Sequence, residues 1–459
     1  MTSLFFRFAF VLVYKLLHNV INWHLITDKE VKFKRLDKVN TMKLKLIATG
    51  ISLALAFSVN AHEIGQKHEH VDGGWNAKAG FVSEDDYKSK LFNTRGKSKE
   101  VIAKRAIWLA EQYDLTRTPE QIKRAEQARA KYKDAIAINS ILPASVGIIG
   151  NTHDHFTTAV QRNKKGGITM ASGTVYAFPA AIPEGTTAYS VTKASDKVIK
   201  KQGMIKVNTT ADIRKAKATN NMAVMYNTQG ADYVADDPEH HAKESYKHGI
   251  RTMNFTYNNN NMLAGGGSTQ DLGLTELGKK WVIEAQKVGV VVDFSHSSND
   301  AAIDAAKIAT KPLIATHSNA MGLFDVSRNM SDDALKAIAS TGGAVCPTGV
   351  GMFLNKEADA SPERYIEHVV YIADLIGKDK VCFSTDYVHN ILDYYKRDIG
   401  STDVYPPELG FGAPISNIAP EHIWDAAAAL EDKHGWTEKE VKGFLGENLM
   451  RVYEANWKK

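Results

Sequence analysis

The chain has 459 residues, which is enough for one large domain with an appended segment. Its hydrophobic content of 44% and charged content of 24% are ordinary for a globular protein. The formal net charge is +5, but residues 1–61 hold nine Lys/Arg against three Asp/Glu, and the remainder holds 48 basic and 49 acidic residues. The basic excess belongs to the amino-terminal segment, so charge gives no reason to expect a nucleic-acid partner.

The amino-terminal segment has the layout of an export signal. From Met42 the sequence reads MKLKLIATGISLALAFSVNA, with two lysines, an apolar run and a small-residue ending at Ala61. This is typical of a secretory signal peptide, and the apolar run is short for a membrane span. We therefore expect residues 42–61 to be removed and the mature protein to be exported to the periplasm, with membrane attachment only if the leader is retained. Residues 1–41 are then either a mis-assigned start or an extra leader.

Residues 62–144 are predicted to form a flexible terminus followed by a helical extension. The stretch 62–75 is polar throughout. From about residue 84 to 136, apolar residues recur at three- and four-residue spacing, which indicates amphipathic helices. Thr118 and Pro119 provide a helix start, because threonine caps and proline fits the first turn.

Residues 145–459 alternate short apolar runs with amphipathic helical stretches. Continuous apolar strands alternating with helices indicate a parallel sheet covered by helices. The eight runs are 146–151, 168–177, 222–228, 252–258, 289–296, 312–318, 342–349 and 380–387. Eight strands over this length predict an α/β fold of the (β/α)8 TIM-barrel type, with the carboxyl-terminal helices packed outside.

Polar residues end several of the predicted strands, and in such barrels the active site lies at those ends. His153 and His155 follow the first predicted strand, and residues two apart on a strand point the same way. The remaining candidates are His296 after the fifth strand, His317 after the sixth and Asp386 after the eighth. This set suits one or two divalent ions, zinc above all, holding a water that becomes hydroxide near neutral pH. Asp386 is also the natural general base.

The chain contains two cysteines, Cys346 and Cys382, each inside an apolar run. An exported protein could pair them in a disulfide, and two buried free thiols fit the sequence equally well. Their spacing does not match a metal site.

Several local motifs resemble the renal (membrane, or microsomal) dipeptidase family, within the wider amidohydrolase-like barrels, across roughly residues 145–456. They are GLTELGKKWVIEAQKVGVVVDFSHSS, KPLIATHSNAMGLFDVSRNMSDDALKAIASTGG, CFSTDY and GFLGENLMRVYEANW. The resemblance implies a metal-dependent barrel hydrolase that cleaves dipeptides, commonly as a homodimer. It implies that His296 and His317 are metal ligands, that Asp386 is the acid/base residue, and that Arg328 binds the substrate carboxylate through its planar guanidinium.

Three positions depart from the family pattern. The family has His-x-Asp after strand 1, where this chain has His153 and His155. A bridging glutamate, which lets two metals share the site, falls at Gln229, a residue that we keep as a candidate ligand. A substrate-contacting histidine falls at Asp232. We therefore predict a metallopeptidase acting on dipeptides or small amides. The alternatives are a mononuclear amidohydrolase using His153, His155, His296 and Asp386 on another C–N or ester bond, and an inactive barrel that binds a ligand.

Overall fold

The computed structural model describes residues 97–397 and 416–458, all within one compact unit that spans His70–Lys459. The predicted signal peptide, the leader and the flexible terminus lie outside the described residues. Within the described part, no helix is both long enough and apolar enough to cross a bilayer.

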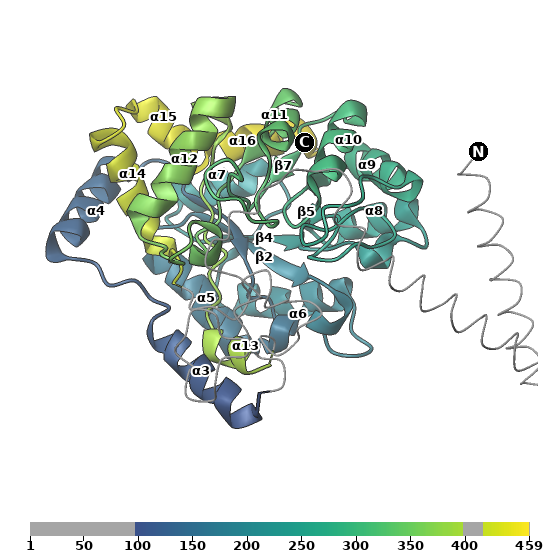
Figure 1. Cartoon of the computed structure of the whole chain (residues 1–459), viewed down its shortest axis with the longest axis horizontal. Coiled ribbons are helices and arrows are strands. Elements are labelled where there is room, and N and C mark those ends of the chain that lie inside the picture. Colours follow the sequence, from purple (N-terminus) through teal and green to yellow (C-terminus); the bar gives the residue numbers. More distant parts are fainter. Residues whose placement is uncertain (1–96, 398–415, 459) are drawn as a thin grey trace, which may run out of the picture. The chain divides into compact units, whose positions relative to one another are not determined.

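A parallel sheet forms the centre of the fold (Figure 1). Its strands pair in the order β1-β2-β4-β5-β6-β7-β8, and β3 adds to β4 alone. The strands are β1 (Ile138–Leu142), β2 (Met170–Tyr176), β3 (Ile205–Lys206), β4 (Ala223–Thr228), β5 (Ile250–Asn254), β6 (Val291–Asp293), β7 (Ile314–Ala315) and β8 (Ala344–Val345). Every pairing is parallel, as strands joined by helical crossovers require.

An extended segment, residues 381–385, joins the two ends of this sheet. Val381 forms a parallel bridge with Val345 of β8, and the Cys382 amide donates to the Val345 carbonyl. On the other side, the Ser140 amide of β1 donates to the Phe383 carbonyl over 3.3 Å. The segment therefore occupies the place of the last barrel strand, which confirms the predicted barrel class.

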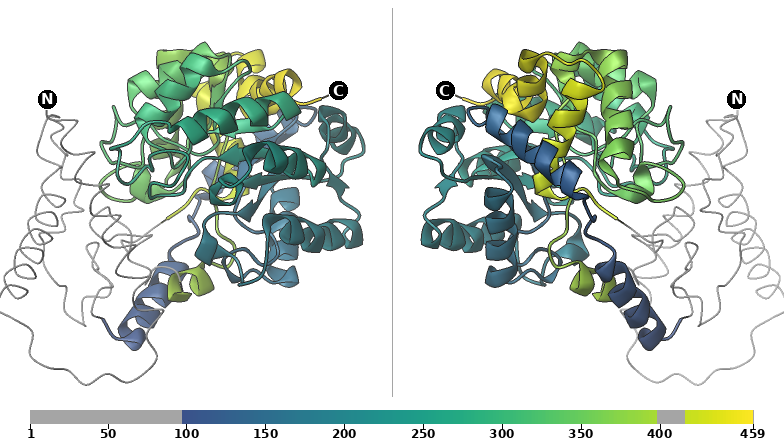
Figure 2. Two further views of the ribbon diagram at one scale, coloured as in Figure 1. Left: turned by 90° about the vertical axis from the view of Figure 1, so that its right-hand side faces the viewer. Right: turned by 90° about the vertical axis from the view of Figure 1, so that its left-hand side faces the viewer.

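Helices surround the sheet, as Figures 1 and 2 show. They are α5 (His153–Lys165), α6 (Ala188–Lys201), α7 (Thr210–Ala218), α8 (Pro238–Lys247), α9 (Glu276–Val288), α10 (Asn299–Ile308), α11 (Asp332–Ser340), α12 (Pro362–Ile376), α13 (Ile391–Arg397), α14 (Ile423–Asp432), α15 (Glu438–Lys442) and α16 (Asn448–Asn456). Most carry one buried apolar face, and α16 packs with residues of the barrel interior, including the Cys346–Cys382 disulfide.

The helical extension contains α3 (Lys99–Glu111) and α4 (Pro119–Lys131). Thr118 caps α4 through a capping box and Pro119 takes its first turn, as predicted. Arg124 of α4 donates two hydrogen bonds to Asp432 at the end of α14. Helix α4 therefore packs on the carboxyl-terminal helix α14, whereas α3 packs on α13 (Figure 2).

One predicted strand is wrong. Residues 146–151 contain the short 3-10 turn η4 (Ile148–Gly150), and the first strand, β1, lies earlier, inside the region assigned to the extension. The barrel thus begins at residue 138 rather than 145. The sequence pattern does not indicate β1 as a strand because Asn139 and Ser140 interrupt its apolar residues. The strand also follows closely after the helical spacing of residues 119–131.

Candidate active site

Two imidazoles lie at the carboxyl ends of adjacent strands. His296 follows β6 and His317 follows β7, and their ring centroids are 4.8 Å apart. Both side chains are buried, and burial together with the nearby Arg328 charge holds the pKa of each well below its usual range. Neutral imidazoles carry one lone pair each, so the hydrogen bonds of the ring decide where that lone pair points.

Hydrogen bonds fix the lone pair of His317 on Nε2. The Thr316 hydroxyl donates its proton to Asp293, so its oxygen accepts from His317 Nδ1 at 2.7 Å. His317 Nε2 is buried and has no hydrogen-bond partner. A buried nitrogen left unpaired costs about 1–3 kcal/mol, which indicates that another group satisfies it.

A longer chain of hydrogen bonds fixes Gln229. Asn227 donates to the Ser172 carbonyl, so its side-chain oxygen accepts from the Thr174 hydroxyl. Thr174 Oγ1 then accepts from Gln229 Nε2 at 3.0 Å, which turns Gln229 Oε1 toward His296. His296 Nδ1 lies 2.8 Å from the Asn258 side-chain oxygen, and His296 Nε2 lies 3.1 Å from Gln229 Oε1.

Polar atoms that can act as metal ligands gather at the two imidazoles. His296 has an acceptor oxygen at each ring nitrogen, the Asn258 oxygen at Nδ1 and Gln229 Oε1 at Nε2, and a neutral ring can donate to only one of them. With the ring proton on Nδ1, both His296 Nε2 and Gln229 Oε1 have lone pairs available, and His317 Nε2 is without a hydrogen-bond partner. Two imidazole nitrogens and an amide oxygen are suitable ligands for a divalent ion. Within the described ranges no three His, Cys, Asp or Glu side chains gather at metal-binding distance, so Asp386 does not join the two imidazoles in such a cluster.

Asp386 and Arg328 add opposite charges to the site. Burial raises the pKa of Asp386 to about 6, and the Arg328 charge opposes that rise. Arg328 is buried, donates to Ser318 and to the His317 carbonyl, and leaves Nε without a partner. Its guanidinium therefore has donor capacity left for an anionic group.

Two of these residues have strained backbones. Asp386 has a φ of 53° and His296 a φ of 66°, in the left-handed region that non-glycine residues rarely adopt. Such strain persists only where the surroundings hold it, and it gathers at functional sites.

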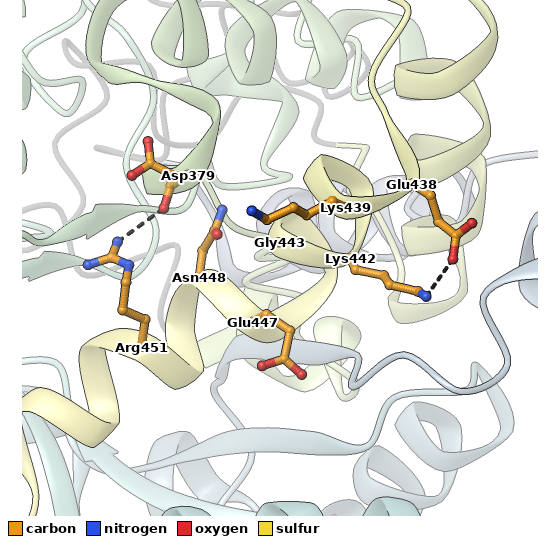
Figure 3. A pocket seen from close by; sticks show the side chains of 8 residues that line it. All are labelled: Asp379, Glu438, Lys439, Lys442, Gly443, Glu447, Asn448 and Arg451. Carbon is orange, nitrogen blue, oxygen red and sulfur yellow. Dashed lines mark hydrogen bonds and ion pairs between the residues drawn. The ribbon is translucent and has the colours of Figure 1, made fainter.

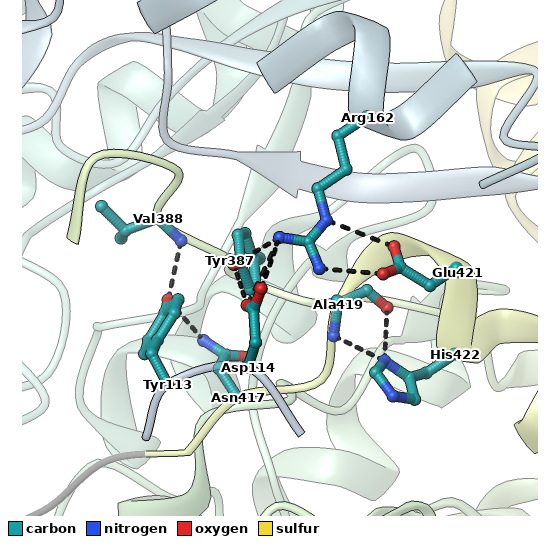
Figure 4. A network of polar contacts seen from close by, with 9 residues as sticks. All are labelled: Tyr113, Asp114, Arg162, Tyr387, Val388, Asn417, Ala419, Glu421 and His422. Atoms are coloured by element: carbon teal, nitrogen blue, oxygen red, sulfur yellow. Dashed lines mark hydrogen bonds and ion pairs between the residues drawn. The ribbon is translucent and has the colours of Figure 1, made fainter. Parts of the chain in front are cut away.

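A polar network holds the segment that follows Asp386 (Figure 4). Tyr113, which follows α3, accepts hydrogen bonds from the Val388 amide and from Asn417. Asn417 also donates to the Asp386 carbonyl over 3.2 Å. Arg162 of α5 donates to Tyr387, and it also pairs with Asp114 and Glu421. Through Tyr113, the extension therefore holds the backbone around Asp386 in place.

The predicted strand-1 ligands lie elsewhere. His153 is exposed and His155 half-exposed, both in the first turn of α5, where Thr152 caps the helix. Residues two apart on a helix point in different directions, so the strand argument for a shared ion does not apply to them. Asp232 lies in the turn η6 (Asp232–Val234), where burial raises its pKa and a hydrogen bond from Asn261 opposes the rise.

Sequence reasoning missed Asn258, Thr316 and Asp293, which orient the two imidazoles. Asn258 stands in a run of asparagines, residues 258–261, and only the fold brings it to His296. Thr316 precedes His317 directly, so the position of its hydroxyl is a local signal that could have been found.

A hollow of about 640 Å³ lies beside Asp379, Lys442, Gly443, Asn448 and Arg451 (Figure 3). Asp379 precedes the segment 381–385 and Asp386 follows it, so this hollow is at the opposite end of the barrel from the imidazoles. Its charged groups are mixed in sign, and Lys442 pairs with Glu438. We assign it no role in catalysis.

Comparison with known proteins gives a consistent picture. Residues 151–394 match the family model described as membrane dipeptidase, peptidase family M19. An amidohydrolase from Pseudomonas aeruginosa is 25% identical, with a TM-score of 0.62 over 72% of this chain and 99% of that chain. The probable dipeptidase PvdM from Pseudomonas aeruginosa is 17% identical, with a TM-score of 0.57 over 74% of this chain and 99% of that one. A metallo peptidase from Rhodobacter sphaeroides, liganded with a phosphinate mimic of the dipeptide L-Ala-D-Ala, is 20% identical, with a TM-score of 0.52 over 70% of this chain and 100% of that one.

Proposed function

Because the chain belongs to the membrane dipeptidase family, peptidase family M19, we propose that it hydrolyses a dipeptide or a related small amide that carries a free carboxylate. Family membership makes it a metal-dependent hydrolase of the dipeptidase type. The observation that supports this site is that His296 and His317 lie side by side with Gln229 Oε1 against His296 Nε2, while the buried His317 Nε2 is without a hydrogen-bond partner.

Arg328 is proposed to bind the substrate carboxylate. Its unpartnered Nε and its remaining hydrogens lie in a buried setting, where an ion pair is stronger than in water. The planar guanidinium donates in a fork that matches a carboxylate, which a lysine cannot reproduce.

Asp386 is proposed to be the general base. With a pKa of about 6 it is mainly ionised at pH 7, so it can take a proton from the attacking water and pass it to the leaving amine. The residues that fit a metal ion are His296, His317 and Gln229, and zinc is the ion that we propose. A bound divalent ion would supply Lewis-acid polarisation of the scissile carbonyl and would acidify the attacking water.

Export to the periplasm is part of the same proposal. The signal-like segment 42–61 supports it, and so does the Cys346–Cys382 disulfide, because disulfides persist mainly in oxidising compartments. The homodimer implied by the family resemblance is likewise proposed, and sedimentation of the purified protein measures it.

The first experiment is elemental analysis of the purified protein, with dipeptide hydrolysis assayed on the same sample. We expect bound zinc and hydrolysis that a chelator removes and zinc restores. An absence of metal after reconstitution, together with no cleavage, would overturn the proposed function.

The role of Arg328 is tested with Arg328→Lys on two substrates, a dipeptide and its carboxyl-terminal amide. Loss of the bidentate pair is expected to raise KM for the dipeptide about 10- to 100-fold and to change the amide little. Arg251→Lys is the matched control, because Arg251 is also buried and donates to the Asn208 and Tyr246 carbonyls away from the imidazoles. Equal losses on both substrates would contradict carboxylate recognition by Arg328.

A further inference from the structure

Two half-buried aromatic side chains lie side by side next to His296. Tyr257 follows β5, and its ring centroid is 4.2 Å from that of His296, with the two ring planes at 21°. Phe178 follows β2, and its ring centroid is 4.9 Å from that of Tyr257. Phe178 and Tyr257 keep part of their surface open to solvent, whereas the imidazole is buried. These two residues form the aromatic wall of the site.

Backbone hydrogen bonds hold the aromatic wall at the same end of the barrel as the imidazoles. The Gln229 amide donates to the Tyr176 carbonyl at the end of β2 over 2.7 Å. The Ala231 amide donates to the Phe255 carbonyl, directly after β5, over 3.1 Å. The segment after β4 is therefore tied to the two loops that carry the wall. The wall thus borders the carboxyl ends of the strands, where the active sites of such barrels lie.

The aromatic wall also lies next to the residue that is proposed to bind the substrate carboxylate. Tyr257 is close enough to Arg328 for the tyrosine oxygen and the guanidinium to interact electrostatically. A carboxylate bound by Arg328 belongs to the carboxyl-terminal residue of a dipeptide. The side chain of that residue leaves from the carbon atom next to this carboxylate, so it is within reach of the wall.

The chemistry of the aromatic wall favours an aromatic or large apolar side chain. Such a side chain buries apolar surface on the two rings, and aromatic rings also pair favourably in offset and tilted arrangements. A lysine or arginine side chain can lie on a ring as well, but the Arg328 charge beside Tyr257 repels a second cation. A small side chain would leave most of the wall uncovered.

We propose that Phe178 and Tyr257 form the subsite for the side chain of the carboxyl-terminal residue of the substrate, and that this subsite selects an aromatic or large apolar residue. This inference rests on the proposed function and deepens it by naming the substrate class. It can fail separately, because a dipeptidase without this preference would still be a hydrolase.

The test compares kcat/KM for dipeptides that differ only in the carboxyl-terminal residue, namely Gly-Phe, Gly-Leu, Gly-Ala and Gly-Lys. We expect Gly-Phe and Gly-Leu to exceed Gly-Ala about tenfold or more, and Gly-Lys to be no better than Gly-Ala. The reversed pair, Phe-Gly and Ala-Gly, is expected to differ by less than about threefold.

Equal values for the glycyl dipeptides, a preference for Gly-Lys, or a preference confined to the reversed pair would overturn the inference and leave the hydrolase standing. No cleavage of any dipeptide would overturn the proposed function. Calorimetric titration with Gly-Phe and with Gly-Ala then still decides the inference, because equal affinities would overturn it.

Variants of the aromatic wall test the subsite directly. Phe178→Ala removes one ring and is expected to reduce the ratio of kcat/KM for Gly-Phe to that for Gly-Ala to within about threefold, mainly through KM. If this variant does not fold, Phe178→Leu takes its place and is expected to lower kcat/KM for Gly-Phe relative to Gly-Leu. Tyr257→Phe keeps both rings and is expected to keep the ratio, which separates the ring from the hydroxyl.

Tyr246→Ala is the matched control. Tyr246 is also half-buried, but its ring lies against Arg251 at the amino end of β5, away from the imidazoles. The ratio is expected to stay unchanged in this variant. A ratio that is unchanged in Phe178→Ala, or that falls equally in Tyr246→Ala, would overturn the inference.

Discussion

Single residues in this protein owe their roles to hydrogen bonds that begin several residues away. The nitrogen of His317 that stays free is set by Thr316 and Asp293, and the orientation of Gln229 is set by Thr174 and Asn227. His296, His317 and Asp386 could be singled out from the sequence because each ends an apolar run, and Arg328 because its motif resembles the dipeptidase family. Asn258 could not, because an asparagine carries no chemical signal until the fold supplies its partners.

Buried histidines away from the site lower the free energy of unfolding at low pH. His368 of α12 accepts from the Ala320 amide at Nδ1 and donates to the Leu354 carbonyl at Nε2, and burial lowers its pKa to about 4. Because the folded pKa lies below the unfolded value of 6.5, its contribution is fully present above pH 6.5 and is lost as the pH falls toward 4.

His368→Gln removes this titration. When the pH is lowered from 7.5 to 5, the free energy of unfolding decreases in both proteins. The decrease is expected to be about 2 kcal/mol smaller in the variant. Urea unfolding at the two pH values measures the difference. An identical pH dependence in both proteins would show that His368 does not titrate in this range.

At the scale of elements, the sequence predicts the helices around the barrel better than its strands. Helices such as α4 show their period and their caps in the sequence, because Thr118 and Pro119 are local signals. Strand β1 lacks a continuous apolar run because it contains Asn139, which donates to Asn163 of α5, and Ser140, which donates to the Thr316 carbonyl after β7.

The bracing of Asp386 by the extension gives a prediction at this scale. Tyr113→Phe removes the acceptor for the Val388 amide and for Asn417, so the strained backbone at Asp386 loses its support. We expect kcat to fall about 3- to 30-fold with little change in KM, and stability to fall by about 1–3 kcal/mol. Steady-state kinetics and urea unfolding measure both.

Tyr132→Phe is the control for that substitution. Tyr132 is a fully buried tyrosine directly after α4, and its hydroxyl lies beside Glu431 of α14, not beside the segment that contains Asp386. Its removal is expected to leave kcat unchanged. Equal kinetic losses in the two variants would contradict a specific brace on Asp386.

Taken as a whole, the described part of the chain is a barrel whose last strand position is occupied by the extended segment 381–385, which has few ladder bonds. The Cys346–Cys382 disulfide joins β8 to this segment, across 36 positions of sequence. The sequence left pairing and free thiols equally open, because it does not show that the two apolar runs are neighbours.

Replacing both cysteines by alanine is expected to lower the free energy of unfolding by about 3–4 kcal/mol, because a loop of this length is released in the unfolded chain. Denaturant unfolding of the oxidised protein and of the double variant measures this. No difference in unfolding would show that the disulfide does not constrain the unfolded chain.

The scarcity of ladder bonds along residues 381–385 also has a consequence for motion. The Ser384 and Thr385 amides donate to the side chains of Tyr365 and Asn139 instead of to a neighbouring strand, and amides outside a continuous ladder are exposed to solvent by brief local openings. Amide hydrogens of residues 381–385 and of the facing residues in β1 and β8 should exchange with deuterium sooner than those between β2 and β4. The register of that pair is continuous from Met170 to Thr174. Asp386 directly follows this segment. Local opening of the barrel is therefore expected first at the backbone that carries the proposed general base.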